Sequence, residues 1–161
     1  DRFGLAAKLS PSEIYIRATA DNPMIDVNLI SSMLDYFSDN DLTYTVYKNY
    51  PIGSGVEIFT ADALSEALLN AIEPYEFEHV TPYMYQRMEN KRVKYYMSSV
   101  DDSAIRMTLD TEQDLLFVRE IFSRLYNEDP LFGISDIKKV LLDNPQLLEI
   151  NCGIHQKALG E

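Results

Sequence analysis

The sequence predicts an α/β fold in which residues 1–161 form a single domain. Segments rich in β-branched and aromatic residues alternate along the chain with segments whose apolar residues recur every three to four positions. No internal repeat, low-complexity tract or flexible linker separates them. Such alternation favours a sheet covered by helices, with ligands bound at the ends of the strands.

The first half of the chain is expected to contain three helices and three strands. Residues 3–9 have the pattern of a helix end, closed by Ser10-Pro11, and residues 13–19 have that of a strand. Asp26 is expected to cap a helix that buries Val27, Ile30, Met33, Leu34 and Phe37. Strands follow over residues 43–47 and 56–59, and Thr60 is expected to cap the next helix.

The second half is expected to be mainly helical. Pro74 suits the first turn of a helix and Pro82 interrupts the helical pattern, so residues 75–90 are expected to form two short helices. Two further strands are predicted over residues 92–97 and 104–109. Helices are predicted over residues 111–127 and 135–143.

Charge and composition exclude several classes of function. The 14 Lys and Arg face 26 Asp and Glu, a net charge of −12 that repels nucleic acid and anionic membranes, so neither is an expected partner. The lone Cys152 cannot form an internal disulfide and gives no metal-site spacing. No apolar run approaches the ~20 residues of a membrane span. These features favour a cytoplasmic protein.

Two acidic motifs carry the candidate chemistry. RATADNPMID (17–26) places Asp21 after a predicted strand, and RMTLDTEQDL (106–115) does the same for Asp110. Strand ends gather at one edge of an open α/β sheet, so these carboxylates are expected to converge as Mg²⁺ ligands. Arg17 and Arg106 precede them by four residues each, which suits a grip on phosphate or carboxylate.

Helix capping offers another explanation for part of this pattern. Thr111-x-x-Asp114 fits a capping box, and a carboxylate at Asp110 would also be stabilised near a helix start. Asp26 fits a helix cap better than a metal ligand. His79 has the alternatives of a substrate contact and a packed residue, and the 11 tyrosines fit a core and a subunit interface, which allows a homodimer.

Five ordered segments resemble the cytidylyltransferases of the spore-coat polysaccharide biosynthesis type, which are related to the synthetases that activate sialic acids and deoxyoctulosonate with CTP. The segments are RATADNPMID (17–26), YPIGSGVEIF (50–59), EPYEFEHVTPYMY (73–85), RMTLDTEQDLLFV (106–118) and NPQLLEINCGIHQK (144–157). The resemblance implies a nucleotide-diphosphosugar transferase fold, an α/β/α sandwich with a mixed sheet, and transfer of CMP from CTP to a sugar acid or related acceptor.

The same resemblance implies roles for individual residues. Asp21 and Asp110 match the aspartates that hold the metal, with Arg17 and Arg106 in the same motifs. Substrate-binding residues on the acceptor side are expected to be Glu57, His79 and Thr81. Attack of the acceptor hydroxyl on the α-phosphorus would depend on positioning and on metal electrostatics.

The chain also departs from the family pattern. Ala20 replaces a usual Gly, Gly55 a frequent Asp and Phe77 a frequent Arg. The Gly- and Lys-rich triphosphate loop expected near the front has no counterpart, so the chain is interpreted as the C-terminal two thirds of the enzyme, with little or no activity alone. The alternatives are a non-catalytic binding or assembly domain and a nucleotidyltransferase that uses another base.

Overall fold

The computed structural model describes residues 2–88 and 92–155, and its centre is a four-stranded mixed sheet. Its strands, in the order β1-β3-β2-β4, are β1 (Ile14–Arg17), β3 (Glu57–Thr60), β2 (Tyr44–Lys48) and β4 (Val93–Met97). β3 is antiparallel to both neighbours, and β4 is parallel to β2. The predicted α/β fold with a mixed sheet is confirmed. The end of the predicted 75–90 helical region and the tail residues Gln156 and Lys157 lie outside the described residues.

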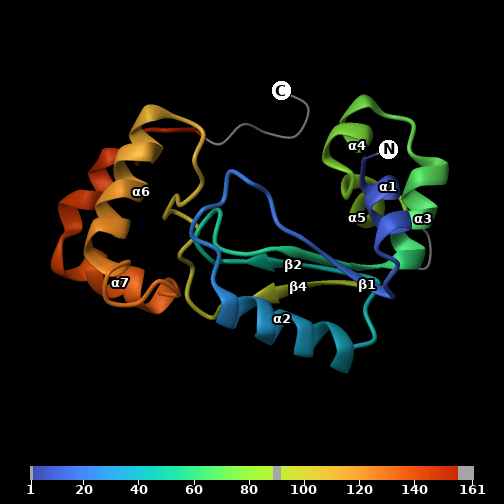
Figure 1. Ribbon diagram of the computed structural model, residues 1–161, viewed down its shortest axis with the longest axis horizontal. Coiled ribbons are helices and arrows are strands. Elements are labelled where there is room, and N and C mark those ends of the chain that lie inside the picture. The colour runs from blue at the N-terminus through green and yellow to red at the C-terminus, as the bar shows by residue number, and fades with distance from the viewer. Residues whose placement is uncertain (1, 89–91, 156–161) are drawn as a thin grey trace.

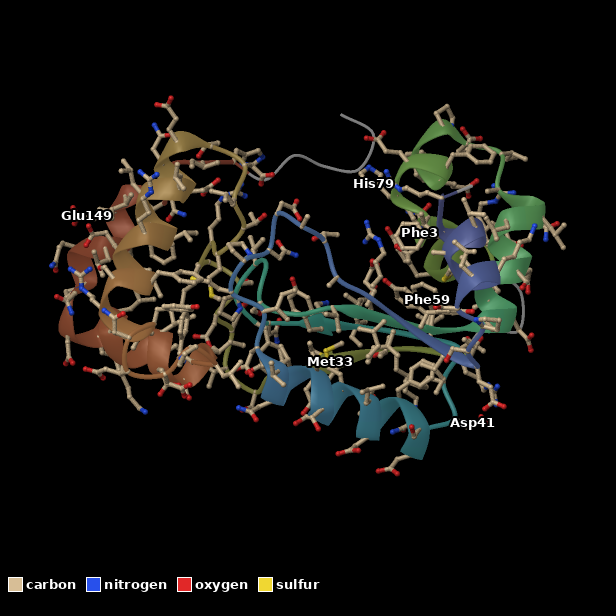
Figure 2. The ribbon with its side chains drawn as sticks, viewed as in Figure 1. Phe3, Met33, Asp41, Phe59, His79 and Glu149 are labelled. Carbon is tan, nitrogen blue, oxygen red and sulfur yellow. The ribbon has the colours of Figure 1, made fainter. Side chains whose placement is uncertain are left out.

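Helices lie on both faces of the sheet (Figure 1). One face is covered by α2 (Val27–Asp39), and the other by α1 (Arg2–Leu9), α3 (Ala61–Asn70), α4 (Pro74–His79) and α5 (Pro82–Gln86). The buried Met33 on α2 and the buried Phe59 on β3 mark the two cores (Figure 2). Within the described ranges, no helix combines the length and the apolar content that a membrane crossing requires.

A third core lies beyond one end of the sheet. Its helices are α6 (Glu112–Leu125), α7 (Ile134–Asp143) and the 3-10 helix η1 (Pro145–Ile150), which the sequence analysis did not predict. Phe117 and Ile121 of α6 and Leu147 of η1 are buried together there, and Met107 contributes from the preceding loop. This helical group therefore packs directly against the loop that leads to Asp110.

The helices begin where the sequence provides caps. Asp26 accepts hydrogen bonds from two backbone N–H groups in the first turn of α2, at 2.8 and 3.1 Å. Thr60 caps α3 by accepting from the N–H of Ala63 at 3.1 Å. Pro74 and Pro82 each open a short helix, where the N–H that a proline lacks would have had no partner. The predicted helix starts at these positions are confirmed.

Residues 104–109, predicted as a fifth strand, do not form one. This segment forms a single isolated bridge, in which Arg106 lies opposite Ile52. The Ile52 carbonyl accepts there from the N–H of Met107 at 2.8 Å. The N–H of Leu109 then donates to the carbonyl of Asp21 at 2.7 Å. The prediction was wrong because the segment binds two separate loops, and its apolar composition reflects burial and not strand pairing.

Candidate active site

Two loops that lie far apart in the sequence meet beside the sheet, and they carry Asp21 and Asp110. The Asp21 carbonyl accepts from the N–H of Leu109 at 2.7 Å and from the hydroxyl of Thr108, 87 positions away, at 3.2 Å. The same hydroxyl lies 3.5 Å from Oδ2 of Asp110. The two acidic motifs are therefore in contact through their backbones and through one shared threonine.

Both aspartates keep carboxylate oxygens available to a ligand. Asp21 is exposed, and its carboxylate has no hydrogen-bond partner in the described part of the chain. The Asp110 side chain is 46% exposed and only its Oδ2 is engaged, by Arg106 at 2.5 Å and by the Thr108 hydroxyl at 3.5 Å. Residues 2–88 and 92–155 contain no group of three or more His, Cys, Asp or Glu that could hold a metal. Two carboxylates nevertheless suit Mg²⁺, which keeps several waters and takes other ligands from phosphates.

Arg106 lies beneath Asp110, in the interior. Its Nε donates to Asp114 at 2.9 Å, and its Nη2 donates to Asp114 at 3.1 Å and to Asp110 at 2.5 Å. Asn151, which follows η1, donates to Asp114 at 2.9 Å and to the Arg106 carbonyl at 3.1 Å. Arg106 is only 6% exposed, so it contacts Asp110 from the interior of the protein.

Asp114 combines the capping function that the sequence predicted with a second function that it did not reveal. Its backbone N–H donates to the Thr111 hydroxyl at 3.2 Å, and its carboxylate accepts from the Thr111 N–H at 3.1 Å, so the capping box is confirmed. Burial alone would raise the pKa of Asp114. Hydrogen bonds from Arg106, Asn151 and the start of α6 outweigh burial and lower the pKa to about 2. Asp114 is therefore ionised at neutral pH.

Three other predicted residues, Arg17, Glu57 and Thr81, meet on the side of the sheet covered by α3–α5. Oε1 of Glu57 accepts from the hydroxyls of Tyr44 at 2.5 Å and Thr81 at 2.7 Å, and Oε2 forms an ion pair with Arg17. The sequence analysis missed Tyr44. Burial, followed by the nearby Glu57 carboxylate, raises the pKa of Tyr44 well above its ordinary value, which keeps its hydroxyl a donor.

A cavity of about 170 Å³ lies next to this cluster. It is lined by Arg17, Thr19, Asn22, Val46, Tyr47, Gly55, Val56 and Glu57. Burial raises the pKa of Tyr47, and the carboxylates of Glu57 and Asp21 add to the rise. Tyr47 is therefore within electrostatic reach of both halves of the candidate site.

His79 stands apart from these clusters. It ends α4 and is half-buried, and Figure 2 shows it on the same side of the sheet as Phe3 and Phe59. Its imidazole makes no hydrogen bond within the described ranges, whereas its carbonyl accepts from the N–H of Thr81 at 2.8 Å. The protein thus links His79 to the Arg17 cluster through the backbone.

Comparison with known proteins assigns the chain to a family. Residues 1–128 match the Cytidylyltransferase family. The chain belongs to the cytidylyltransferase family. It is 35% identical to an uncharacterized protein of Methanocaldococcus jannaschii, over 100% of this chain and 66% of that protein. It is also 28% identical to the spore coat polysaccharide biosynthesis protein SpsF of Bacillus subtilis, over 90% of this chain and 61% of SpsF.

A solved structure agrees with the family. The structure of a cytidylyltransferase from Leptospira borgpetersenii serovar Hardjo-bovis matches with a TM-score of 0.85 and 27% identity, over 98% of this chain and 66% of that one. The chain thus spans 61–66% of the length of these relatives. These matches do not support the expectation that the chain is only the C-terminal two thirds of the domain and lacks its N-terminal part, and it stays a prediction.

One departure of the chain from the expected family pattern has a steric cause. A Cβ placed on Gly55 would lie 2.4 Å from the ring of Tyr47. No side chain fits there while Tyr47 keeps its position, so the Asp expected at this position has no room. The other two departures, Ala20 and Phe77, are exposed, with Phe77 at 56%.

Proposed function

We propose that this member of the cytidylyltransferase family carries the metal-binding and acceptor-binding groups for transfer of CMP from CTP to a sugar acid, or a related hydroxyl compound, in surface polysaccharide biosynthesis. The contact between the two acidic loops carries the proposal, since the 2.7 Å hydrogen bond from Leu109 to Asp21 brings Asp110 beside Asp21. The family and the similarity to SpsF, a spore coat polysaccharide biosynthesis protein, support the substrate class.

Asp21 and Asp110 are the proposed Mg²⁺ ligands. Bound there, the ion would neutralise negative charge on the phosphates and favour departure of pyrophosphate. Arg106 fixes the Asp110 carboxylate through its 2.5 Å ion pair. The neighbouring Asp114, held ionised, balances the charge of Arg106, so that Asp110 is not its sole counter-ion.

The acceptor side is proposed to lie at the cavity beside Arg17. The guanidinium of Arg17 offers donors to an anionic group, while Glu57, Thr81 and His79 shape this side of the site. In the reaction, the acceptor hydroxyl oxygen attacks the α-phosphorus of CTP and the bond to pyrophosphate breaks. The products are the CMP-linked acceptor and pyrophosphate.

Release of pyrophosphate from CTP tests this function. Sialic acid and deoxyoctulosonate serve as acceptors, with Mg²⁺ and then with EDTA, in the 161-residue chain and in the longest natural polypeptide that contains it. We expect Mg²⁺-dependent turnover in that natural polypeptide and little or none in the chain alone. Turnover with UTP or another nucleotide in place of CTP would indicate that the enzyme uses a different base. No turnover with any nucleotide in the natural polypeptide would favour a non-catalytic binding domain.

Substitutions assign the metal residues. We expect Asp21→Asn and Asp110→Asn each to reduce turnover by about a hundredfold or more, because each removes a charged Mg²⁺ ligand. Asp35→Asn, an exposed change on the far side of α2, provides the matched control and should leave turnover unchanged. Full Mg²⁺-dependent activity in Asp21→Asn would contradict the assignment.

A further inference from the structure

Val80 lies in an uncommon backbone conformation between α4 and α5, with φ of 70° and ψ of −52°. β-Branched residues rarely adopt a positive φ, because their Cβ then crowds the backbone. The N–H of Thr81 donates to the carbonyl of His79 at 2.8 Å, which closes a strained γ-turn around Val80. Val80 is 9% exposed and belongs to the same core as Tyr44 and Met84, so packing holds the turn in this state.

The turn orients the side chain of the next residue, Thr81, towards Glu57. Thr81 is 2% exposed, and its hydroxyl donates to Oε1 of Glu57 at 2.7 Å. Tyr44 donates to the same oxygen at 2.5 Å, and Arg17 pairs with the other. Protein donors therefore engage both oxygens of Glu57, and the carboxylate acts as a fixed support for Arg17.

Arg17 is held on two sides and leaves its buried Nε–H without an acceptor among the described residues. Its guanidinium carbon lies 5.9 Å from the ring centroid of Phe3, and one terminal nitrogen pairs with Glu57. Its Nε is buried and has no hydrogen-bond acceptor among the described residues. Proteins rarely leave a buried N–H unpaired, because it loses its hydrogen bonds to water without replacement. Arg17 also lines the 170 Å³ cavity and its side chain is 15% exposed, so the terminal end of its guanidinium can meet a ligand there.

We propose that the γ-turn at Val80 is a positioning device for Arg17. Acting through Thr81 and Glu57, it holds the guanidinium so that its accessible terminal N–H groups meet an anionic oxygen, of a carboxylate or a phosphate, in the cavity. We call this chain of contacts, from Val80 through Thr81 and Glu57 to Arg17, the relay. It rests on the geometry alone, and only the identification of the anion as a substrate group rests on the proposed function. Val80, Thr81 and Tyr44 are positioning residues, because they act on the anion through Glu57 and Arg17.

The Arg17 Nε–H resonance in the nitrogen–proton NMR spectrum of the 161-residue chain tests the relay directly. Sodium acetate and inorganic phosphate are the two probes. We expect one of them to shift this resonance saturably, acetate if the site takes a carboxylate and phosphate if it takes a phosphoryl group. An Arg17 resonance that neither anion shifts would overturn the proposal.

Three threonine variants separate positioning from stability. Thr81→Val removes only the hydroxyl and should weaken binding of the responding anion by about tenfold. Thr81→Ser keeps the hydroxyl and should bind within about twofold of the parent. Thr45→Val is the matched control, since Thr45 is fully buried and donates at 2.8 Å to the carbonyl of Lys94, away from Arg17. Equal binding by Thr81→Val and Thr45→Val would refute the relay.

Steady-state kinetics add a readout that distinguishes this proposal from the proposed function. Thr81→Val should raise the KM of the substrate that supplies the anion by about tenfold, with kcat within about twofold, because the lost hydrogen bond affects binding of the anion. Unchanged KM values in this variant would count against the relay. These kinetics use the longest natural polypeptide that contains the chain. Absence of CMP transfer in that polypeptide would refute the proposed function, and the NMR titration of the threonine variants would still test whether Thr81 positions Arg17.

Discussion

Replacing Asp114 with asparagine removes the buried negative charge beneath Asp110 while keeping the size of the side chain. Asp114 is fully buried and accepts hydrogen bonds from Arg106 at 2.9 and 3.1 Å and from Asn151 at 2.9 Å. Asparagine keeps one oxygen acceptor but introduces an NH₂ group that faces the donors of Arg106. Of the two carboxylates that pair with the buried guanidinium, the substitution leaves only the half-exposed Asp110.

The pKa of Asp114 sets the size of the effect. Lowering the pKa from 3.8 to about 2 corresponds to about 2.4 kcal/mol at ~1.36 kcal/mol per pKa unit. Because the group is fully buried, solvent screening takes little from this figure. Breaking one side of a buried ion pair costs about 3–5 kcal/mol in general. We therefore expect Asp114→Asn to lower the free energy of unfolding at pH 7 by about 3 kcal/mol.

The same charge predicts a pH dependence. The folded-state pKa of Asp114 is lowered, so its stabilisation is complete above the unfolded value near 3.8 and is lost as the pH falls towards about 2. Urea unfolding followed by circular dichroism at pH 7, 4 and 3 measures this loss. Asp114→Asn should lose less stability than the parent between pH 4 and 3, and Asp35→Asn should behave as the parent. An Asp114→Asn protein within about 1 kcal/mol of the parent at pH 7, with an unchanged pH profile, would refute the reasoning.

Three further substitutions test packing and backbone geometry. Val80→Gly should be about 1 kcal/mol more stable to urea than Val80→Ala, since glycine accepts a φ of 70°, and the reverse order would argue against the γ-turn. Gly55→Ala should cost about 1–3 kcal/mol because its Cβ would lie 2.4 Å from the Tyr47 ring, and a double-mutant cycle with Tyr47→Ala should recover most of the loss. Asp26→Ala should cost about 2 kcal/mol and reduce hydrogen-exchange protection of the Ile134 amide, which donates to Asp26 at 2.8 Å; unchanged protection there would contradict that contact.

The sequence predicted elements well where local chemistry decides them. Asp26 and Thr60 are good caps in any context, because their side-chain oxygens satisfy backbone N–H groups within the same turn. The convergence of Asp21 and Asp110 was also predicted, from the rule that strand ends gather at one edge of a sheet. That rule correctly brought together the two loops that carry these residues, although the segment before Asp110 is no strand, and the convergence of their carboxylates on a metal stays a prediction.

The parts that the sequence did not reveal depend on register and burial. Tyr44 reaches Glu57 because β2 pairs with β3, with Tyr44 opposite Phe59 and Val46 opposite Glu57. No spacing in the sequence indicates this pairing. The burial of Arg106 was equally hidden, since its partner Asn151 follows a 3-10 helix near the end of the described chain. Side chains that meet through tertiary packing leave little local signal.

The hydrogen bonds of Ile134 and Asn151 have a consequence for biosynthesis. The family match ends at residue 128. The hydrogen bond to Asp26 from Ile134 and the one to Asp114 from Asn151 both come from residues after that point. Translation proceeds from the N-terminus, and domains fold as their residues emerge. A nascent chain from which only residues up to the end of α6 have emerged lacks the Asn151 amide that donates to Asp114 and to the Arg106 carbonyl. We therefore expect the loop bearing Asp110 to reach its final form only after residue 151 has emerged.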